Sequence, residues 1–217
     1  MYQYREDGRR VAMIEKVEIT DITSQKKATD RVNIFVDGNY FGSMYVDMCI
    51  KHGIKKGLVI ELDKLNDIML ESDKEIALNK TAKYISAKMK TKKEVRDYLY
   101  SKEYSKVVVD YVIGKLVEYK YLDDENYVIA YVNTYKSKYG VLKMKNNLIL
   151  KGIDSKYLEE FFAEYETDMD IIFAIAEKYM KNKENTYDNL SKLYRHLASR
   201  GYSYDEISAV VNKFKGE

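Results

Sequence analysis

Clustered cations are the residues of this chain whose types and spacing best suit a binding chemistry. Five lie within nine residues, in a segment predicted to span a loop and a helix start, and four more lie at the corresponding junction further on. Ammonium and guanidinium groups at this density bind phosphates of nucleic acid or an acidic protein face. An ordinary solvated lysine surface is the other interpretation. The candidate contact residues are Lys88, Lys90, Lys92, Lys93, Arg96, Lys136, Lys138, Lys143 and Lys145.

The residues that could support catalysis or a metal have simpler structural interpretations. The acidic residues 123–125 suit a helix N-terminus, where carboxylates complement the dipole, better than a metal site. His196 is expected to be a solvated or capping residue, and Cys49 lies in an apolar stretch that suits a small core residue. Four glycines between residues 38 and 57 lack the spacing of a phosphate loop. We therefore expect no catalytic residue, no metal and no cofactor.

The net charge of +2 is unevenly distributed along the chain. Residues 80–120 hold 11 basic and 5 acidic side chains, a net of +6, whereas residues 153–177 hold 1 basic and 8 acidic side chains, a net of −7. This arrangement predicts a dipolar surface that would steer a charged partner. The acidic segment would face away from that partner or meet its basic loops.

Composition limits the compartment and the class of protein. Charged residues make up 33% of the chain and proline is absent, which favours long, solvated helices. One cysteine excludes an internal disulfide, and one cysteine with two histidines argues against a zinc site. The first ten residues are too polar for a signal peptide, and no apolar run approaches the ~18 residues that span a bilayer. We expect a soluble, cytoplasmic monomer without a membrane segment.

Residues 1–72 are predicted to form a small β-rich domain. Asp37-Gly38 stands between two β-rich runs, and this pair predicts a hairpin because a type I′ turn needs positive φ at both central residues. The minimal module is a three-stranded sheet with a helix or turn around residues 45–51, and one more short strand is compatible with it. The candidate strands are residues 11–19, 31–36, 39–44 and 58–61.

From about residue 73 the hydrophobic period becomes helical, and one pattern recurs every 49 residues. An apolar stripe with i, i+3, i+4, i+7 spacing is preceded by Gly152 or Gly201, each at the place where a helix C′ residue adopts the left-handed conformation. Such a set in three ungapped copies predicts a structural repeat. The apolar rows are Val95, Met144 and Leu193; Leu99, Leu148 and Leu197; Val109, Leu158 and Ile207; Val112, Phe161 and Val210; Ile113, Phe162 and Val211; and Leu116, Tyr165 and Phe214.

Residues that begin helices recur with the same period. Ser203 with Glu206 has the spacing of a capping box, as does Thr91 with Glu94. The predicted N-cap row consists of Ser105, Asp154 and Ser203.

A further helix precedes each copy of the pattern, so each repeat contains three helices. The predicted fold is mainly α, a tandem array of three three-helix repeats, elongated and curved, preceded by the small β-rich domain. The preceding helices are expected at roughly residues 74–88, 124–137 and 168–181. The repeats are expected at residues 73–120, 121–167 and 168–217.

Three local sequences carry a resemblance to a known family. Residues 82–95, Ala-Lys-Tyr-Ile-Ser-Ala-Lys-Met-Lys-Thr-Lys-Lys-Glu-Val, are similar to the pattern Ala-x-Tyr-Leu-x-x-Arg-x-Arg-Ser-x-x-Glu-Leu. Residues 121–127 are similar to Gly-Tyr-Leu-Asp-Asp-x-x-Tyr, and residues 139–153 carry Tyr-Gly followed by Leu-x-x-Lys-Gly-Ile. In this order and spacing they resemble the RecX family of bacterial recombination regulators, over nearly the whole chain. The departures are Lys88 and Lys90 in place of Arg, Thr91 in place of Ser and Val141 in place of Pro; lysine keeps the charge of arginine but loses its bidentate fork.

The resemblance implies a non-enzymatic protein that binds the RecA recombinase, particularly its filament on single-stranded DNA. It implies that binding inhibits or tunes strand exchange, ATP hydrolysis and co-protease activity, from a position in the filament groove. Homologous recombination, DNA repair and the SOS response are the processes concerned. The residues themselves leave an alternative, a helical protein that acts directly on DNA through its basic stripe. Weak contact with single- or double-stranded DNA is also compatible with the recombinase function. The β-rich domain would add a contact with the partner or cap the first repeat.

Overall fold

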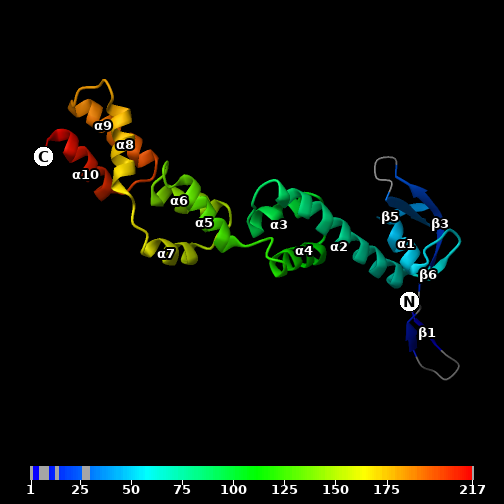
Figure 1. Cartoon of the computed structure of the whole chain (residues 1–217). Coiled ribbons are helices and arrows are strands. Elements are labelled where there is room, and N and C mark those ends of the chain that lie inside the picture. The colour runs from blue at the N-terminus through cyan, green and yellow to red at the C-terminus, as the bar shows by residue number, and fades with distance from the viewer. Residues whose placement is uncertain (1, 5–9, 13–14, 26–29, 217) are drawn as a thin grey trace. The chain divides into compact units, whose positions relative to one another are not determined.

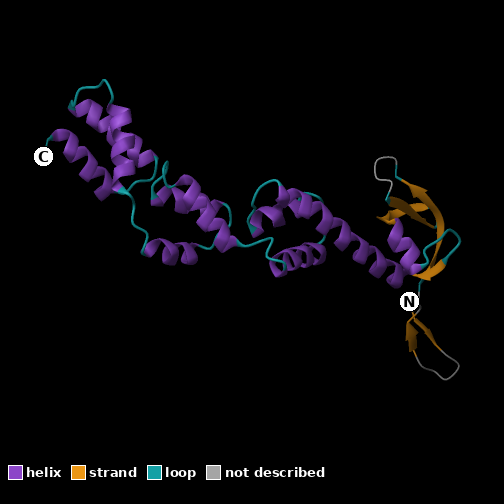
Figure 2. Cartoon of the chain, viewed as in Figure 1, coloured by secondary structure: helices purple, strands orange, loops and turns teal. Residues whose placement is uncertain are grey.

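The computed structural model describes residues 2–4, 10–12, 15–25 and 30–216 (Figure 1). The chain forms two compact units, one containing residues 1–88 and 98–118 and the other containing residues 89–97 and 119–217. It is mainly helical, with its sheet near the N-terminus (Figure 2). The predicted fold class, helices in sets of three after a small β-rich domain, is confirmed.

Four antiparallel strands form the larger of the two sheets described in the first unit. β3 (Lys16–Ser24) lies between β4 (Arg31–Val36) and the short β6 (Val59–Glu61), while β5 (Asn39–Tyr45) pairs with the far side of β4. The short strand expected over residues 58–61 thus makes the sheet four-stranded.

The strand predicted over residues 11–19 is wrong in its bounds. Part of it belongs to β2 (Arg10–Ala12), which pairs with β1 (Tyr2–Tyr4), and residues 13–14 lie outside the described residues. β3 instead continues to Ser24, because Thr23 and its neighbours find backbone partners in β4 even though their side chains do not alternate in polarity.

The hairpin between β4 and β5 is confirmed. Val36 pairs with Asn39, and the two residues between them have φ values of 48° at Asp37 and 84° at Gly38. Both central residues are therefore left-handed, as a type I′ turn requires. The backbone N–H of Gly38 also donates to Thr20 Oγ1 at 2.9 Å, which ties the turn to β3.

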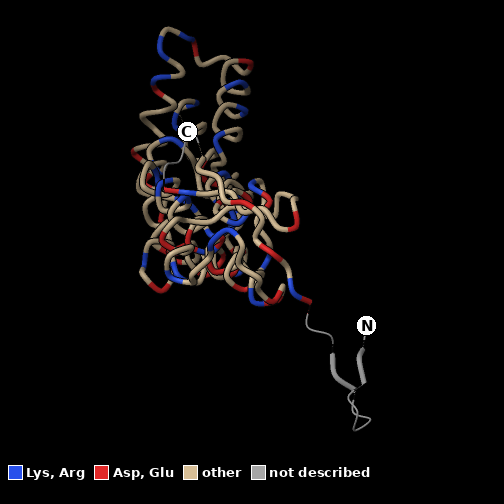
Figure 3. The backbone as a smooth tube through the Cα atoms, turned by 90° about the vertical axis from the view of Figure 1, so that its right-hand side faces the viewer, with Lys and Arg blue, Asp and Glu red and all other residues tan. Residues whose placement is uncertain are grey.

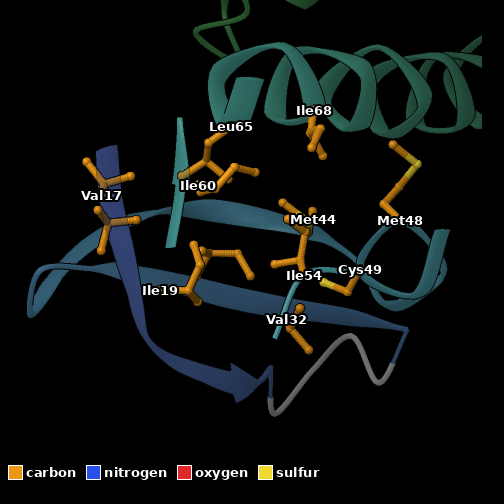
Figure 4. Packing of buried hydrophobic residues seen from close by; sticks show 12 residues of the cluster. Val17, Ile19, Val32, Met44, Met48, Cys49, Ile54, Ile60, Leu65 and Ile68 are labelled. Atoms are coloured by element: carbon orange, nitrogen blue, oxygen red, sulfur yellow. The ribbon is translucent and has the colours of Figure 1, made fainter. Parts of the chain in front are cut away.

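The sheet buries one face against two helices, α1 (Val46–His52) and the start of α2 (Leu62–Ser86) (Figure 4). Ile19 and Met44 of the sheet meet Leu65 and Ile68 of α2 in this core. Cys49 of α1 is buried in the same cluster, which confirms it as a core residue.

α2 begins at Leu62, well before the predicted start at residue 74. Its first turns carry mixed charges, and only a narrow stripe is buried, so the sequence pattern did not distinguish them from a linker. That stripe runs through Leu65, Ile68, Ser72 and Ile76, at spacings of three and four residues.

The helices after α2 form the repeats. The first three-helix set is completed by α3 (Lys92–Tyr100) and α4 (Lys106–Glu118). The second contains α5 (Asp124–Tyr135), α6 (Val141–Leu150) and α7 (Ser155–Ala163), and the third α8 (Met169–Met180), α9 (Tyr187–Ser199) and α10 (Tyr204–Lys215).

Most of the 49-residue rows are confirmed in burial, although Phe161, Tyr165 and Phe214 are only partly buried. The left-handed position of the repeat is confirmed in backbone conformation. Leu99, Leu148 and Leu197 are fully buried. The row that begins with Glu103 is left-handed in all three copies, with φ values of 62°, 85° at Gly152 and 84° at Gly201. Each set therefore turns between its second and third helices through the same backbone geometry.

Candidate partner-binding surface

Eight of the nine predicted contact residues belong to the second unit, whereas Lys88 follows α2 in the first. Basic and acidic positions are interspersed along the described backbone (Figure 3). The local partner of each cation therefore decides whether it is held inside the protein or presented to another molecule.

The N-terminus of α3 is built by a capping box. Glu94 donates its backbone N–H to Thr91 Oγ1 at 3.2 Å, and its carboxylate accepts the backbone N–H of Thr91 at 3.0 Å. This confirms the predicted box and satisfies two backbone donors that a helix start leaves open. The next backbone N–H, that of Lys92, donates to Asp124 Oδ1 at 2.9 Å, so the start of α3 is fixed to the start of α5.

The same helix start receives the turn that follows α6, in what we call the first joint: Thr91, Lys93, Glu94, Lys151 and Gly152. The Thr91 hydroxyl donates to the backbone carbonyl of Lys151 at 2.7 Å, and Lys151 Nζ lies 2.6 Å from Glu94 Oε1. A Cβ on Gly152 would lie 2.4 Å from Cβ of Lys93, so the turn approaches α3 as closely as its lack of a side chain permits.

A second joint lies 49 residues further on: Gly140, Leu142, Lys143, Arg200 and Gly201. The backbone N–H groups of Gly140 and Leu142 donate to the carbonyls of Arg200 and Gly201, at 2.9 and 3.1 Å. A Cβ on Gly201 would lie 2.3 Å from the backbone N of Lys143. Each position matches one in the first joint, so the same contact between a helix start and a turn recurs with the repeat period.

Electrostatics hold the first joint's ion pair in its charged form. Burial alone would raise the pKa of Glu94, but hydrogen bonds from Lys151 and from the Thr91 backbone outweigh it and leave this pKa below its usual value. Burial would lower the pKa of Lys151, yet the hydrogen bonds with Glu94 and Tyr127 raise it. Both groups are therefore charged across neutral pH.

Several predicted contact residues are occupied by such internal interactions. Lys93 Nζ pairs with Asp97 at 2.7 Å, and Lys143 Nζ donates to the backbone carbonyl of Ser199 at 3.0 Å. Lys145 Nζ pairs with Glu159 at 2.9 Å, and only 19% of its side chain is exposed. Lys90 is half-buried and acts electrostatically on Glu94.

The remaining candidates form no ion pair with a residue that the structure describes. Lys92 is half-buried, and within the described residues it has no ion pair. Four others are exposed and likewise form no ion pair with any residue that the structure describes; we call them the outward cations, Lys88, Arg96, Lys136 and Lys138.

The role of Lys151 and Arg200 in the joints was missed by the sequence reasoning. The available signal was their row, since basic residues stand at 102, 151 and 200. Residue type alone does not show that such a cation meets a carboxylate or carbonyl from a helix more than fifty residues away in sequence.

The acidic residues 123–125 act at a helix start, as interpreted. Asp123 is the N-cap of α5 and accepts the backbone N–H groups of Glu125 and Asn126 at 3.0 Å. These hydrogen bonds lower its pKa. Among the described residues, no three His, Cys, Asp or Glu side chains converge on a metal position.

His196 is half-buried rather than solvated. Its ring stacks on Tyr179 with centroids 4.4 Å apart, and its Nε2 accepts a hydrogen bond from Arg200 Nε at 3.1 Å. Burial, followed by the charges of Arg200 and Lys183, lowers its pKa. In the described part of the chain no helix has the length and apolar character needed to cross a bilayer.

Three family models match parts of this chain. Residues 17–61 match the regulatory protein RecX N-terminal domain, residues 77–116 match the first three-helix domain of RecX, and residues 166–211 match the third. The first lies on the sheet, and the other two fall on three-helix sets.

Relatives and solved structures agree with these matches. A regulatory protein RecX of Clostridium acetobutylicum is 34% identical over 94% of this chain and 99% of its own length. That of Bacillus subtilis is 34% identical over 92% of this chain and 78% of its own. A RecX crystal structure from Lactobacillus salivarius matches 67% of this chain and 98% of its own with a TM-score of 0.60 and 27% identity. A crystal structure of another regulatory protein RecX covers 93% of this chain with a TM-score of 0.64, at 22% identity.

Proposed function

Because this chain belongs to the RecX family of regulatory proteins, we propose that it binds the RecA recombinase and its filament on single-stranded DNA. Binding inhibits or tunes strand exchange, ATP hydrolysis and co-protease activity. The chain acts by occupancy rather than by chemistry of its own, in keeping with a family of non-enzymatic regulators.

The observation that supports particular contact residues is that the outward cations form no ion pair with described residues. Arg96 lies one turn beyond the first joint, while Lys136 and Lys138 lie in the loop that leads into the second. The joints are closed by internal hydrogen bonds and an ion pair that do not use the outward cations, so these cations remain for an external anion. Filament phosphates and acidic patches of the recombinase are both suitable anions.

We further propose that the chain lies in the filament groove, as the family resemblance implies. Two of the outward cations lie close in sequence to the start of α3 and two to the start of α6, so they are available to charged groups of the filament. Binding along the groove would let one chain contact several recombinase subunits and would slow the rearrangements that ATP hydrolysis drives.

The test is a titration of this chain into RecA assembled on single-stranded DNA. We expect ATP hydrolysis and strand exchange to fall at ratios well below one chain per recombinase subunit. Full activity at equimolar chain, measured at moderate salt, would contradict the proposal. Bovine serum albumin at the same mass is the control for nonspecific crowding.

The alternative is direct binding to DNA, and the absence of ion pairs at the outward cations, among described residues, also favours it. Direct binding predicts submicromolar affinity for single-stranded DNA without recombinase, with an affinity that falls steeply as salt rises. Fluorescence anisotropy of a labelled oligonucleotide distinguishes the two functions, since the recombinase function requires filament binding even where free DNA binds weakly.

A further inference from the structure

The third repeat carries an apolar groove between α9 and α10 with a volume of about 350 Å³, which we call the α9–α10 groove. Leu190 and Val211 form its floor, and both are largely buried. Tyr187 and Tyr194 form its walls, and Tyr187 is 88% exposed. Arg195 and Lys215 stand at its rim. The volume lies at the small end of the range of about 300–1,000 Å³ that is usual for ligand sites.

At the equivalent position of the second repeat a paired lysine lies over the apolar surface. Residues 145, 159 and 162 lie 49 positions before Tyr194, Ser208 and Val211. In the second repeat Lys145 lies over the ring of Phe162, with Nζ 5.6 Å from the centroid, and is held there by its ion pair with Glu159. Because the Lys145 side chain is mostly buried, we infer that its aliphatic stem packs on the apolar surface while Glu159 neutralises its charge.

We call Lys145 and Glu159 the lid of the second repeat. The third repeat has neither residue at the equivalent positions. Tyr194 replaces the lysine and contacts Tyr204 edge-on, with centroids 6.5 Å apart, while Ser208 replaces the glutamate. The floor is accordingly left open as a groove. Tyr204 is itself 70% exposed, so the apolar surface continues beyond the groove along α10.

The positive charge at the rim of the α9–α10 groove favours an acidic occupant. Lys192 of the same helix is paired with Asp188 at 2.6 Å. Arg195 and Lys215 form no ion pair with a residue that the structure describes. An occupant with carboxylates on either side of an apolar group would neutralise both while covering the floor.

We propose that the α9–α10 groove receives an aromatic or branched aliphatic side chain from an acidic segment of a protein partner. Tyrosine and arginine around an aliphatic floor are typical of the centres of protein interfaces, where one anchor side chain contributes much of the affinity. The aliphatic floor suits such a side chain, and acidic residues on either side of it would pair with Arg195 and Lys215. The identity of the partner as the recombinase rests on the proposed function.

A double variant is designed to close the groove with the same residue pair that occupies the equivalent positions of the second repeat. Tyr194→Lys with Ser208→Glu transfers the lid of the second repeat to the equivalent positions of the third. Because the second repeat folds with that pair, we expect the double variant to fold, which circular dichroism and the unfolding midpoint would check. The two single variants are matched controls, since neither provides a complete lid.

The groove itself can be tested without the recombinase. Methyl groups of Leu and Val are labelled with 13C, and the probes are a 15-residue peptide with Phe and Leu flanked by Glu, the same peptide with Lys for Glu, and a dT12 oligonucleotide. We expect the acidic peptide to shift the Leu190 and Val211 methyl signals, with the shift lost in the double variant. No shift with the acidic peptide would overturn the proposal, as would a shift caused by dT12 alone.

Filament binding then tests the partner. We expect the double variant to bind the recombinase filament at least about tenfold more weakly than wild type, as loss of an anchor contact predicts. Equal binding by the double variant and wild type would overturn the groove's role at the filament. Failure of wild type to bind the filament would instead contradict the proposed function, and the methyl shifts would still decide what the groove receives.

Discussion

At the residue scale, the second joint depends on a glycine whose own backbone would tolerate any residue. Gly140 has φ of −76° and ψ of 170°, an ordinary extended conformation, so conformational freedom does not explain it. A Cβ at this position would lie 2.3 Å from the backbone carbonyl oxygen of Gly201. Close approach between two repeats is therefore what glycine permits here.

Gly140→Ala should separate this joint. We expect a loss of about 1–3 kcal/mol in the free energy of unfolding, because the added methyl group displaces backbone that cannot move aside. Gly114→Ala is the matched control: Gly114 lies in α4 with nothing within 4 Å of its added Cβ, and the same change should stabilise by about 0.5–1 kcal/mol. Urea denaturation measures both. Equal effects of the two variants would contradict a close contact at the joint.

Glu94→Gln should reveal the ion pair of the first joint through its pH dependence. The pKa of Glu94 lies below its usual value in the folded protein, so its contribution is complete above the unfolded-state pKa of about 4.3 and is lost as pH falls through the folded value. Lys151 has a raised pKa, so its contribution is complete below about 10.4 and is lost as pH rises through its folded value.

Between those limits, wild type should exceed Glu94→Gln by about 1 kcal/mol, since both side chains are partly exposed. The difference in the free energy of unfolding should be constant from pH 6 to 8 and should narrow toward pH 3. A difference that stays the same at pH 3 would show that the carboxylate's charge is unimportant.

At the joints, contacts between residues close in sequence could be predicted, whereas contacts between distant residues could not. Thr91 and Glu94 were predicted as a capping box, because that box depends on residues three apart. The ion pair between Glu94 and Lys151 was not predicted, since it depends on where α6 ends relative to α3. The same difference separates the outward cations from Lys145, which the sequence grouped together.

At the element scale, helix starts in this chain are set by local chemistry and repeat with the period. Ser203 caps α10 in a full capping box, with its hydroxyl accepting from the Glu206 backbone N–H at 3.3 Å and its own N–H donating to the Glu206 carboxylate. Ser105 holds the same row before α4, but within the described residues its side chain makes no hydrogen bond.

Ser203→Ala should therefore destabilise the third repeat by about 0.5–2 kcal/mol, the usual effect of removing a helix cap. Ser105→Ala, at the equivalent position, should change the free energy of unfolding by only a few tenths of a kcal/mol. Thermal unfolding followed by circular dichroism would measure both. A larger loss from Ser105→Ala would refute the difference in capping.

Elements whose bounds follow from such local signals were predictable, and others were not. The hairpin at Asp37-Gly38 and the caps depend on residues within a few positions of each other. The start of α2 depends on Leu65 and Ile68 meeting the sheet, which is a tertiary event. The extension of β3 to Ser24 likewise follows from pairing with β4 rather than from its own pattern.

At the scale of the whole molecule, the similarity to the family extends over nearly the full chain, whereas the outward cations proposed as partner contacts are only a few side chains. The period predicted three-helix sets because burial repeats with it. It did not predict which cations remain unpaired, because each pairing needs a carboxylate from another element. Lys145 and Glu159, on α6 and α7, are one such pair.

Reversing the charge of the four outward cations tests whether they contribute together to binding of the partner. Replacing Lys88, Arg96, Lys136 and Lys138 by Glu removes no ion pair formed with described residues, so the fold should persist. We expect at least about tenfold weaker inhibition of the recombinase ATPase at moderate salt, and a shallower dependence of inhibition on salt, since fewer charged contacts remain. The matched control reverses four other exposed lysines, Lys55, Lys64, Lys178 and Lys181, at the same change in net charge. Equal loss in both variants would show that overall charge, rather than the position of the outward cations beside the joints, governs binding.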